Sequence, residues 1–301
     1  MNIGITGARG RLGRSLKKHF EDAGHRVIAF SRNEDLMHAS LTNLGDFVSR
    51  DELDWILHAA WSTVPSTAEK SPGGEWIYDL PLLSKILQIL LNKKRYSNGK
   101  TTPKLLFLST CSVYGEMKPE GSAFDESITV SPIGWYASGK VAAENLIANF
   151  GCRNDLHSLI LRVSNPYGFI QEKHFSQGVI PAMLVAALEN KPFSMWGHGD
   201  ALKDYLHIDD FCRGVESAMS ASLEGIFNLA SGQSVTVLDV IAKVMCLTGR
   251  QIEQIQKEEC PWDVKNAVYS VKNLQTHTGW VPKIFLEEGL QRLIKNWPAL
   301  S

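Results

Sequence analysis

The amino-acid sequence predicts an α/β protein whose N-terminal half is a doubly wound parallel sheet. Short apolar or β-branched runs alternate in this half with longer segments of helical periodicity. A glycine-rich turn joins the first apolar run directly to the first helical segment. Each crossover between parallel strands has to return over a face of the sheet, so this order of elements places helices on both faces.

The expected strands and helices follow one another in regular order. Strands are expected at residues 3–6, 26–30, 55–58, 104–109 and 158–163. Helices are expected between them, at residues 11–22, 77–91 and 136–150.

The second part of the chain departs from this regular order. Glycine and proline become frequent after Asn165, and a further apolar run appears later. We therefore expect residues 1–165 and about 204–231 to form the sheet domain. The other segments, about 166–203 and 232–301, are expected to form a smaller, discontinuous C-terminal lobe that binds the substrate.

The composition excludes several classes of protein. The 301 residues carry 31 Lys and Arg against 32 Asp and Glu, a formal net charge of −1, so no basic field is present to collect nucleic acid or anionic lipid. Five cysteines lack CxxC spacing, and no other residues have metal-ligand spacing. The chain opens without a secretion signal, and its apolar stretches are too short to span a membrane. We expect a cytoplasmic protein that binds neither nucleic acid, nor membrane, nor metal.

The glycine-rich turn has the spacing of a phosphate-binding loop. Its three glycines let the backbone turn tightly, approach a pyrophosphate and pack the following helix on the sheet. The N–H groups at the start of that helix favour an anion. Cofactor contacts are expected at Gly7, Arg9, Gly10, Arg11, Leu12 and Gly13. A plain strand-to-helix turn is the alternative, but the position between the first strand and the first helix favours a Rossmann-like dinucleotide site.

The end of the second expected strand indicates which dinucleotide binds. A site for NAD usually carries an acidic residue there, which binds the ribose hydroxyls. Here the strand is followed by Ser31 and Arg32, and a guanidinium beside a hydroxyl suits the 2′-phosphate of NADP(H). Arg9 would supply a second cation. A solvated surface charge is the alternative for Arg32, and we expect NADP(H) more than NAD(H).

Tyr136 and Lys140 are the first catalytic candidates. They are four residues apart, which places both side chains on one face of a helix. A nearby ammonium favours phenolate and makes the phenol a usable proton donor to a carbonyl group. The pair is commonplace by itself, but Ser109 and Thr110 lie at the end of the fourth expected strand, where a hydroxyl can hold the same carbonyl oxygen.

Further motifs continue along nearly the whole chain. They are His58-Ala59-Ala60, Ser109-Thr110 ahead of Val113-Tyr114-Gly115, Tyr136 with Lys140, and the segments 161–168, 203–210 and 227–232. In this order, after the glycine loop, they resemble the extended short-chain dehydrogenase/reductase family. The resemblance is to its NAD-dependent epimerase/dehydratase type, which acts on nucleotide sugars.

The resemblance implies a role for each matching residue. Thr110 and Tyr136 would bind the reacting oxygen, and Tyr136 would pass the proton. Lys140 would lower the pKa of this tyrosine and hold the nicotinamide ribose. Further cofactor contacts are implied at His58, Ala59, Ala60 and Pro166, and substrate contacts at Thr110, Asn165 and Lys203.

Two positions depart from the family pattern. Lys203 stands where the family usually has arginine, so a single ammonium group replaces a guanidinium that could bind a phosphate through two parallel hydrogen bonds. The segment Tyr78-Asp79-Leu80-Pro81 replaces one that begins with asparagine and ends in Gly-Thr. The proton-relay or structural role of that asparagine is therefore either absent or taken by another residue.

Several other residues have ordinary interpretations. Trp61 either borders the active site or belongs to the core, and Cys111 is expected to be a small buried hydrophobe rather than an acid. His174 and His198 are expected to make polar contacts in the smaller lobe. Glu144 is expected to lie at the surface or in packing.

We expect an NADPH-dependent reductase that acts on a keto group, at C4, of a nucleoside-diphosphate sugar. A redox-neutral nucleotide-sugar epimerase is the alternative. A dehydratase is less expected because Thr110 is not followed by an acidic pair, and a non-catalytic NADP(H) sensor would tend to lack Tyr136 and Lys140. The resemblance also implies a homodimer through the helix with Tyr136 and the helix of residues 77–91, unless these apolar residues only cover the sheet.

Overall fold

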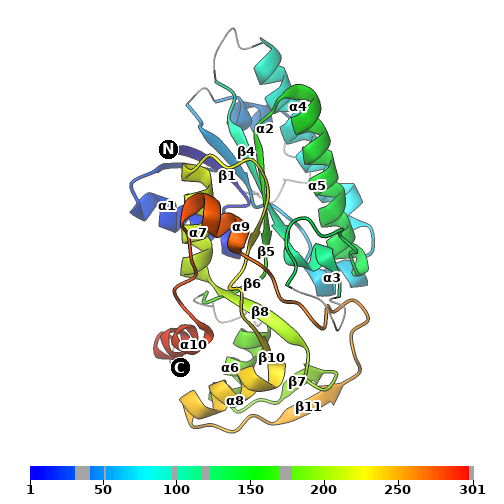
Figure 1. The fold of residues 1–301 in the computed structure, drawn as a ribbon, viewed down its shortest axis with the longest axis vertical. Coiled ribbons are helices and arrows are strands. Elements are labelled where there is room, and N and C mark those ends of the chain that lie inside the picture. Colours follow the sequence, from blue (N-terminus) through cyan, green and yellow to red (C-terminus); the bar gives the residue numbers. More distant parts are fainter. Residues whose placement is uncertain (31–40, 51, 97–100, 117–122, 170–177, 298–301) are drawn as a thin grey trace. The chain divides into compact units, whose positions relative to one another are not determined.

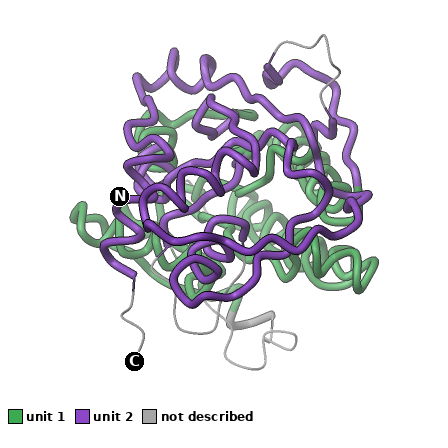
Figure 2. Tube along the Cα trace, turned by 90° about the horizontal axis from the view of Figure 1, so that it is seen from below, with its two compact units in different colours: residues 1–113, 134–162, 215–227 green, residues 114–133, 163–214, 228–301 purple. Residues whose placement is uncertain are grey.

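The computed structural model describes residues 1–30, 41–50, 52–96, 101–116, 123–169 and 178–297. The chain divides into two compact units, shown in Figure 2. The first comprises residues 1–113, 134–162 and 215–227, and the second comprises residues 114–133, 163–214 and 228–301. Both units are therefore assembled from segments that are far apart in the sequence.

The first unit is built on a six-stranded sheet with the order β2-β1-β3-β4-β5-β9. The strands are β1 (Asn2–Thr6), β2 (Arg26–Phe30), β3 (Trp55–His58), β4 (Lys104–Thr110), β5 (Ser158–Val163) and β9 (Gly225–Leu229). β1 pairs in parallel with both β2 and β3, and β3 pairs in parallel with β4. The strand order reverses at β1, and ligands of such sheets bind beyond the carboxyl ends of the strands at this point. The expected doubly wound α/β fold is confirmed.

Helices cover both faces of this sheet. α1 (Arg11–Asp22) lies on one face, and α4 (Leu80–Tyr96) and α5 (Gly134–Asn154) lie on the other (Figure 1). α2 (Leu41–Val48), α4 and α5 bury Phe47, Leu87 and Ile147 in a common apolar core. Burial of each such side chain contributes about 1.5–3 kcal/mol. The short helices α3 (Pro65–Lys70) and η2 (Cys111–Tyr114) complete this part of the chain.

The chain enters α4 through a π-helical turn, η1 (Glu75–Asp79), which the sequence does not predict. The backbone N–H of Leu80 donates to the carbonyl of Glu75, five residues earlier. Pro81 lies in the first turn of α4 and has no N–H to donate to the carbonyl four residues before it. The ordinary α-helical bonding is therefore interrupted here, and the α-helix expected from residue 77 begins at Leu80 instead.

The second unit contains two small sheets and several helices. One sheet joins β6 (Asn165–Tyr167), β8 (Leu202–His207) and β10 (Ser234–Thr236), and the other joins β7 (Phe193–Trp196) and β11 (Gln254–Lys257). The helices are α6 (Val179–Glu189), α8 (Val237–Thr248), α9 (Lys272–Thr278), α10 (Leu286–Lys295) and the first part of α7 (Ile208–Ser220), whose residues from 215 on belong to the first unit. α6, α8 and α10 share an apolar core that includes Met183, Ile241 and Leu290.

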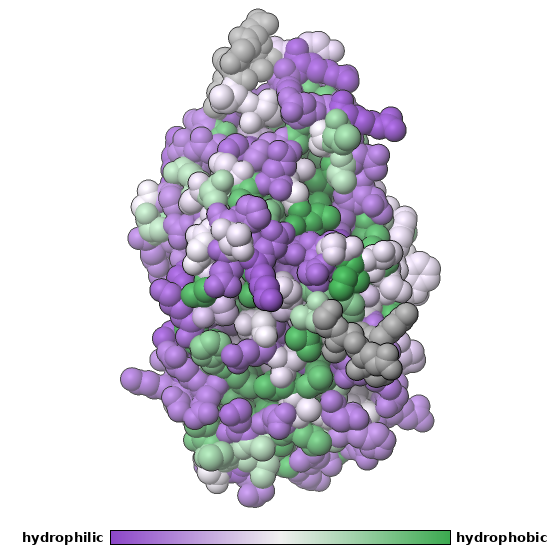
Figure 3. Space-filling view, in the orientation of Figure 1, coloured by the Kyte–Doolittle hydropathy of each residue, from purple (hydrophilic) through white to green (hydrophobic). Residues whose placement is uncertain are grey.

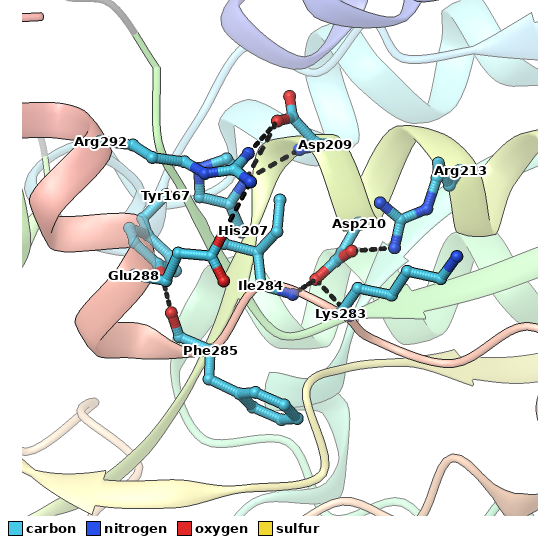
Figure 4. Close-up of polar contacts among 10 residues, drawn as sticks. All are labelled: Tyr167, His207, Asp209, Asp210, Arg213, Lys283, Ile284, Phe285, Glu288 and Arg292. Atoms are coloured by element: carbon cyan, nitrogen blue, oxygen red, sulfur yellow. Dashed lines mark hydrogen bonds and ion pairs between the residues drawn. The ribbon is translucent and has the colours of Figure 1, made fainter.

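Asp210, at the start of α7, anchors the segment that leads into α10 (Figure 4). Its Oδ2 accepts hydrogen bonds from the backbone N–H groups of Lys283, at 2.9 Å, and Ile284, at 2.7 Å. Its Oδ1 pairs with Arg213. Each backbone N–H that Asp210 pairs would otherwise be buried without a partner, at a cost of about 1–3 kcal/mol in the free energy of folding. This network stabilises the second unit.

Candidate active site

The glycine-rich turn has the backbone geometry that a pyrophosphate needs. Gly7 follows β1 with a φ of +71°, and a Cβ placed on it would lie 2.6 Å from the backbone nitrogen of Ala60. A Cβ on Gly13 would lie 2.2 Å from the carbonyl oxygen of Gly7. Gly10 is the N-cap of α1, so the unpaired N–H groups of the first helical turn begin at this loop. The loop therefore fits the diphosphate of a nicotinamide dinucleotide.

The structure places the other loop residues around this turn. Arg9 and Arg11 are exposed, and Leu12 is half-buried. Ala59 follows β3, and its backbone N–H donates to the carbonyl of Thr6 at 3.2 Å. Ser31 and Arg32, the residues expected to bind the 2′-phosphate, lie outside the described residues.

His58 is a buried neutral side chain that connects β3 to β1. Its Nδ1 lies 2.7 Å from the Thr6 hydroxyl, and its ring stacks on Phe107. Burial, together with the charge of Lys140, lowers the pKa of His58 to about 3. This histidine therefore holds the strand ends at the cofactor loop and is not a proton donor at neutral pH.

Thr110, Tyr136 and Lys140, the three catalytic candidates, come together in the first unit. Thr110 ends β4, where its hydroxyl donates to the Ser112 hydroxyl at 3.2 Å and lies near enough to Tyr136 to lower the pKa of the phenol. Tyr136 and Lys140 lie on the same side of α5, with the Lys140 Nζ 5.8 Å from the centre of the phenol ring. A hydroxyl and a phenol therefore share one location at the carboxyl end of the sheet, where they can hold a carbonyl oxygen together.

Lys140 is held in an aromatic and largely buried environment. Its Nζ donates to the carbonyl of Leu108 at 2.8 Å and lies 3.8 Å from the centre of the Trp61 ring and 4.7 Å from that of Phe107. Burial lowers the pKa of Lys140 to about 7, while the charges of Asp79, Glu144 and Glu75 act in the opposite direction. Trp61 thus lies against the Lys140 ammonium and also packs against the apolar core, so it has features of both expected roles.

The structure reverses the expected effect on the Tyr136 phenol. The spacing to Lys140 led us to expect a lowered pKa. Burial raises the pKa of Tyr136 instead, the charges of Asp79 and Glu75 raise it further, and only the hydrogen bond with Thr110 lowers it. Tyr136 is therefore a neutral phenol at neutral pH rather than a phenolate.

Two carboxyl groups of η1 belong to this site, and sequence reasoning did not identify them as site residues. Glu75 has no exposed surface and Asp79 is 3% exposed. Asp79 accepts hydrogen bonds from the backbone N–H and the hydroxyl of Ser62, at 2.8 and 2.7 Å. The only signal in the sequence was the departure from the family pattern at residues 78–81.

The candidate substrate contacts lie in the second unit. Asn165 and Pro166 are on β6, and the side chain of Asn165 donates to the carbonyl of Asp204 at 2.8 Å. Lys203 is on β8, where its ammonium group pairs with Asp263 at 2.5 Å. The three residues thus lie on adjacent strands of one small sheet, because β6 pairs with β8.

The remaining candidates have structural contacts. Cys111 is buried, and its thiol lies 3.1 Å from the carbonyl of Arg162. Glu144 is also buried and binds the Arg162 guanidinium at 2.7 Å, so it is a packing residue and not a surface one. His198 lies 3.0 Å from the Gln256 side chain, and His174 lies outside the described residues.

Two absences concern the described residues only. No helix in these parts of the chain is both long and apolar enough to cross a membrane. The same residues contain no group of three His, Cys, Asp or Glu side chains that could hold a metal ion. Hydrophilic side chains dominate the face shown in Figure 3, with apolar ones scattered among them.

Comparisons with known proteins match these features. The dTDP-4-dehydro-6-deoxyglucose reductase of Escherichia coli is 26% identical over 259 residues, which cover 85% of this chain and 78% of the reductase. The chain spans about three fifths of the length of several other curated relatives, among them dTDP-glucose 4,6-dehydratases and a putative UDP-glucose 4-epimerase.

Solved structures share the fold. The UDP-glucose 4-epimerase of Thermus thermophilus, in complex with NAD, has a TM-score of 0.84 at 24% identity, with 98% of each chain covered. RMD from Pseudomonas aeruginosa, in complex with NADPH, has a TM-score of 0.83 at 22% identity, with 98% of each chain covered. The family model of the NAD dependent epimerase/dehydratase family matches residues 3–230. The chain belongs to this family of nicotinamide-dependent enzymes, which confirms the resemblance seen in its motifs.

Proposed function

We propose that this enzyme reduces a keto group, at C4, of a nucleoside-diphosphate sugar with NADPH. The observation that carries the proposal is the position of the Tyr136 phenol, beside Lys140 on α5 and near Thr110 at the carboxyl end of β4. A reduction needs a proton donor at this position, whereas oxidation of a sugar alcohol needs a base. The 26% identity to the Escherichia coli reductase over most of both chains supports the same direction of reaction.

The side chains of the first unit would share the chemistry. The bound nicotinamide dinucleotide supplies the hydride. Thr110 and Tyr136 would both donate hydrogen bonds to the carbonyl oxygen of the sugar, and the proton of the Tyr136 Oη would pass to that oxygen. Lys140 would stabilise the phenolate that remains, since an ammonium nearby favours the charged phenol. Removal of one such donor costs about 10²- to 10³-fold in rate.

The preference for NADPH over NADH rests on Ser31 and Arg32, which follow β2 in place of an acidic residue. One charge-assisted hydrogen bond to the 2′-phosphate contributes about 1.5–3 kcal/mol, which is roughly ten- to hundredfold in affinity. We therefore expect NADPH to bind more tightly than NADH, and Arg32→Ala to remove most of the difference. Fluorescence titration with both cofactors measures it. Equal affinities in the unaltered protein would exclude a site built for the 2′-phosphate.

The reductase is distinguished from an epimerase by its consumption of cofactor. Purified enzyme is incubated in heavy water with a panel of nucleotide keto-sugars and the corresponding nucleotide sugars, with and without NADPH. Nicotinamide absorbance reports cofactor consumption, and NMR reports the configuration of the sugar. We expect one NADPH consumed for each keto-sugar reduced. Inversion of a sugar carbon without loss of NADPH would reject the reductase in favour of the epimerase.

A further inference from the structure

The five side chains of the π-helical turn η1 differ in their exposure to solvent. Glu75 and Asp79, at its two ends, are buried, whereas Trp76, Ile77 and Tyr78 between them are 43%, 64% and 46% exposed. Two acidic side chains are thus turned into the protein and three apolar ones are turned out. Burial of a carboxyl group is costly unless it is paired, so an inward pair calls for a functional explanation.

The two carboxyl groups are held in place by the segment after β3. Asp79 accepts its two hydrogen bonds from Ser62, and one oxygen of Glu75 accepts a hydrogen bond from the Thr63 hydroxyl at 2.5 Å. The other oxygen, Oε2, is buried and has no hydrogen-bond partner among the described residues. Glu75 is therefore held by a hydrogen bond at one of its two oxygens only.

Helix α5 has a gap that accommodates Glu75 next to the catalytic lysine. A Cβ on Gly139 would lie 2.6 Å from the Cγ of Glu75 and 2.7 Å from its Cβ, and 3.5 Å from Trp61. Lys140 follows directly, and its Nζ lies 3.8 Å from the centre of the same Trp61 ring. The absence of a side chain at Gly139 thus brings the carboxyl group of Glu75 against the helix that carries Tyr136 and Lys140.

We propose that Glu75 and Asp79 are positioning residues that keep the Tyr136–Lys140 pair in its fully protonated form, the form that gives a proton to a carbonyl oxygen. Negative charge nearby opposes the loss of a proton from either group. During reduction the Tyr136 O–H bond breaks, the proton joins the substrate oxygen, and hydride from the nicotinamide joins the carbonyl carbon. Oxidation of an alcohol would require the opposite starting state. The inference rests on the proposed function for its direction.

The charges around the pair agree with this assignment. The charges of Asp79 and Glu75 raise the pKa of Tyr136 and also that of Lys140, against the lowering by burial in the case of the lysine. Asp79 is itself affected, since burial and the charge of Glu75 raise its pKa while the Ser62 hydrogen bonds and the charge of Lys140 lower it.

Other titratable groups face the pair from the neighbouring elements. Glu144 on α5 also favours the charged lysine, but it is paired with Arg162 of β5. His58 on β3 is neutral because burial and Lys140 lower its pKa to about 3. Glu69 on α3 accepts a hydrogen bond from the backbone N–H of Trp135, at the start of α5, and lies outside this buried cluster. Glu75 and Asp79 can therefore each be replaced by the isosteric amide, which removes a carboxylate near the pair without breaking an ion pair.

The test follows the charge of Lys140 directly. Full-length protein, labelled at lysine Cε and tyrosine Cζ with an NMR-active carbon isotope, is titrated without substrate or cofactor. Lys140→Met and Tyr136→Phe identify the two signals. The Lys140 signal is expected to change with a midpoint at about 7 in the unaltered protein. Asp79→Asn and Glu75→Gln are each expected to lower that midpoint by about one pH unit, and to start the ionisation of Tyr136 at a lower pH.

Glu69→Gln is the matched control, because it removes a carboxylate near α5 that lies outside the buried cluster, and it is expected to leave both signals unchanged. Circular dichroism confirms that each variant is folded, and either substitution alone decides the question. An unchanged Lys140 midpoint in a folded variant would overturn the inference. In assays of keto-sugar reduction, the alkaline loss of kcat/KM is expected at a lower pH in both variants. If the variants show the expected NMR shifts but the unaltered enzyme reduces no keto-sugar, the reductase proposal is rejected and the role of Glu75 and Asp79 stands.

Discussion

The pKa values of single side chains at this site depend more on burial than on the spacing of the residues in the sequence. Tyr136 and Lys140 have the separation expected of a proton-transfer pair. The pKa of the lysine is nevertheless lowered to about 7 by burial, and that of the tyrosine is raised by burial and by two carboxylates. Spacing along a helix indicates which groups are neighbours, but the sign of a pKa shift depends on every group around them.

Tyr136→Phe is expected to lower the turnover of the nucleotide keto-sugar by about 10²- to 10⁴-fold, because it removes the proton donor and leaves the ring in place. The affinity for the cofactor should stay within about twofold of the unaltered protein, since the glycine loop is untouched. Steady-state kinetics and cofactor titration measure the two quantities. Turnover near that of the unaltered enzyme would mean that another group supplies the proton.

His58 is expected to make the first unit sensitive to acid. Its pKa is about 3 in the folded protein, against 6.5 as the ordinary value. A group whose folded pKa is lowered stabilises the fold above its ordinary pKa, and this contribution is lost as pH falls below 6.5 toward about 3. The loss is about 1.4 kcal/mol for each pH unit in this window.

Urea unfolding at several pH values measures this dependence. His58→Asn, which cannot titrate in this range, is the comparison. The stability difference between the unaltered protein and His58→Asn should shrink as the pH is lowered from 6.5 to 4.5. A difference that stays constant with pH would show that His58 does not titrate on unfolding.

At the scale of elements, local patterns predict the sheet and fail at the π-helical turn. The expected strands at residues 26–30 and 55–58 and the helix at residues 11–22 have the bounds that the structure shows, because apolar runs and glycine turns specify them locally. η1 changes the helical period just before Pro81. A period of 3.6 also places Glu75 and Asp79, four residues apart, on one face, but it does not indicate that this face points inward, so this half of the site required the structure.

Gly139→Ala is expected to destabilise the protein by about 1–3 kcal/mol, since the added methyl group overlaps Glu75, which has no exposed surface. Gly45→Ala in α2 is the control, because nothing lies within 4 Å of a Cβ at that position. There the alanine should stabilise the helix by about 0.5–1 kcal/mol. Thermal and urea unfolding compare the two. Similar effects at both positions would contradict the close packing of Glu75 on α5.

At the scale of the whole molecule, the chain carries a net charge of −1, so charge repulsion does not oppose self-association. Its first unit exposes a group of large apolar side chains, Trp76, Ile77 and Tyr78 of η1 together with Trp135 of α5. The rings of Trp76 and Trp135 are in edge contact at 5.8 Å between their centres. We call this group the aromatic patch. Clustered exposed aromatic residues are typical of protein–protein interfaces.

The family resemblance implies a homodimer through the helix with Tyr136 and the helix of residues 77–91, and we expect the aromatic patch, which adjoins these helices in the sequence, to form part of the contact. Ile77→Glu places a charge on the most exposed of its residues, at 64%, and should shift the protein to a monomer at micromolar concentration. Leu238→Glu, at a position 43% exposed in the second unit, is the matched control and should leave the oligomeric state unchanged. Light scattering after size-exclusion chromatography gives the mass of each variant. An unaltered protein that is already a monomer at this concentration would reject the interface.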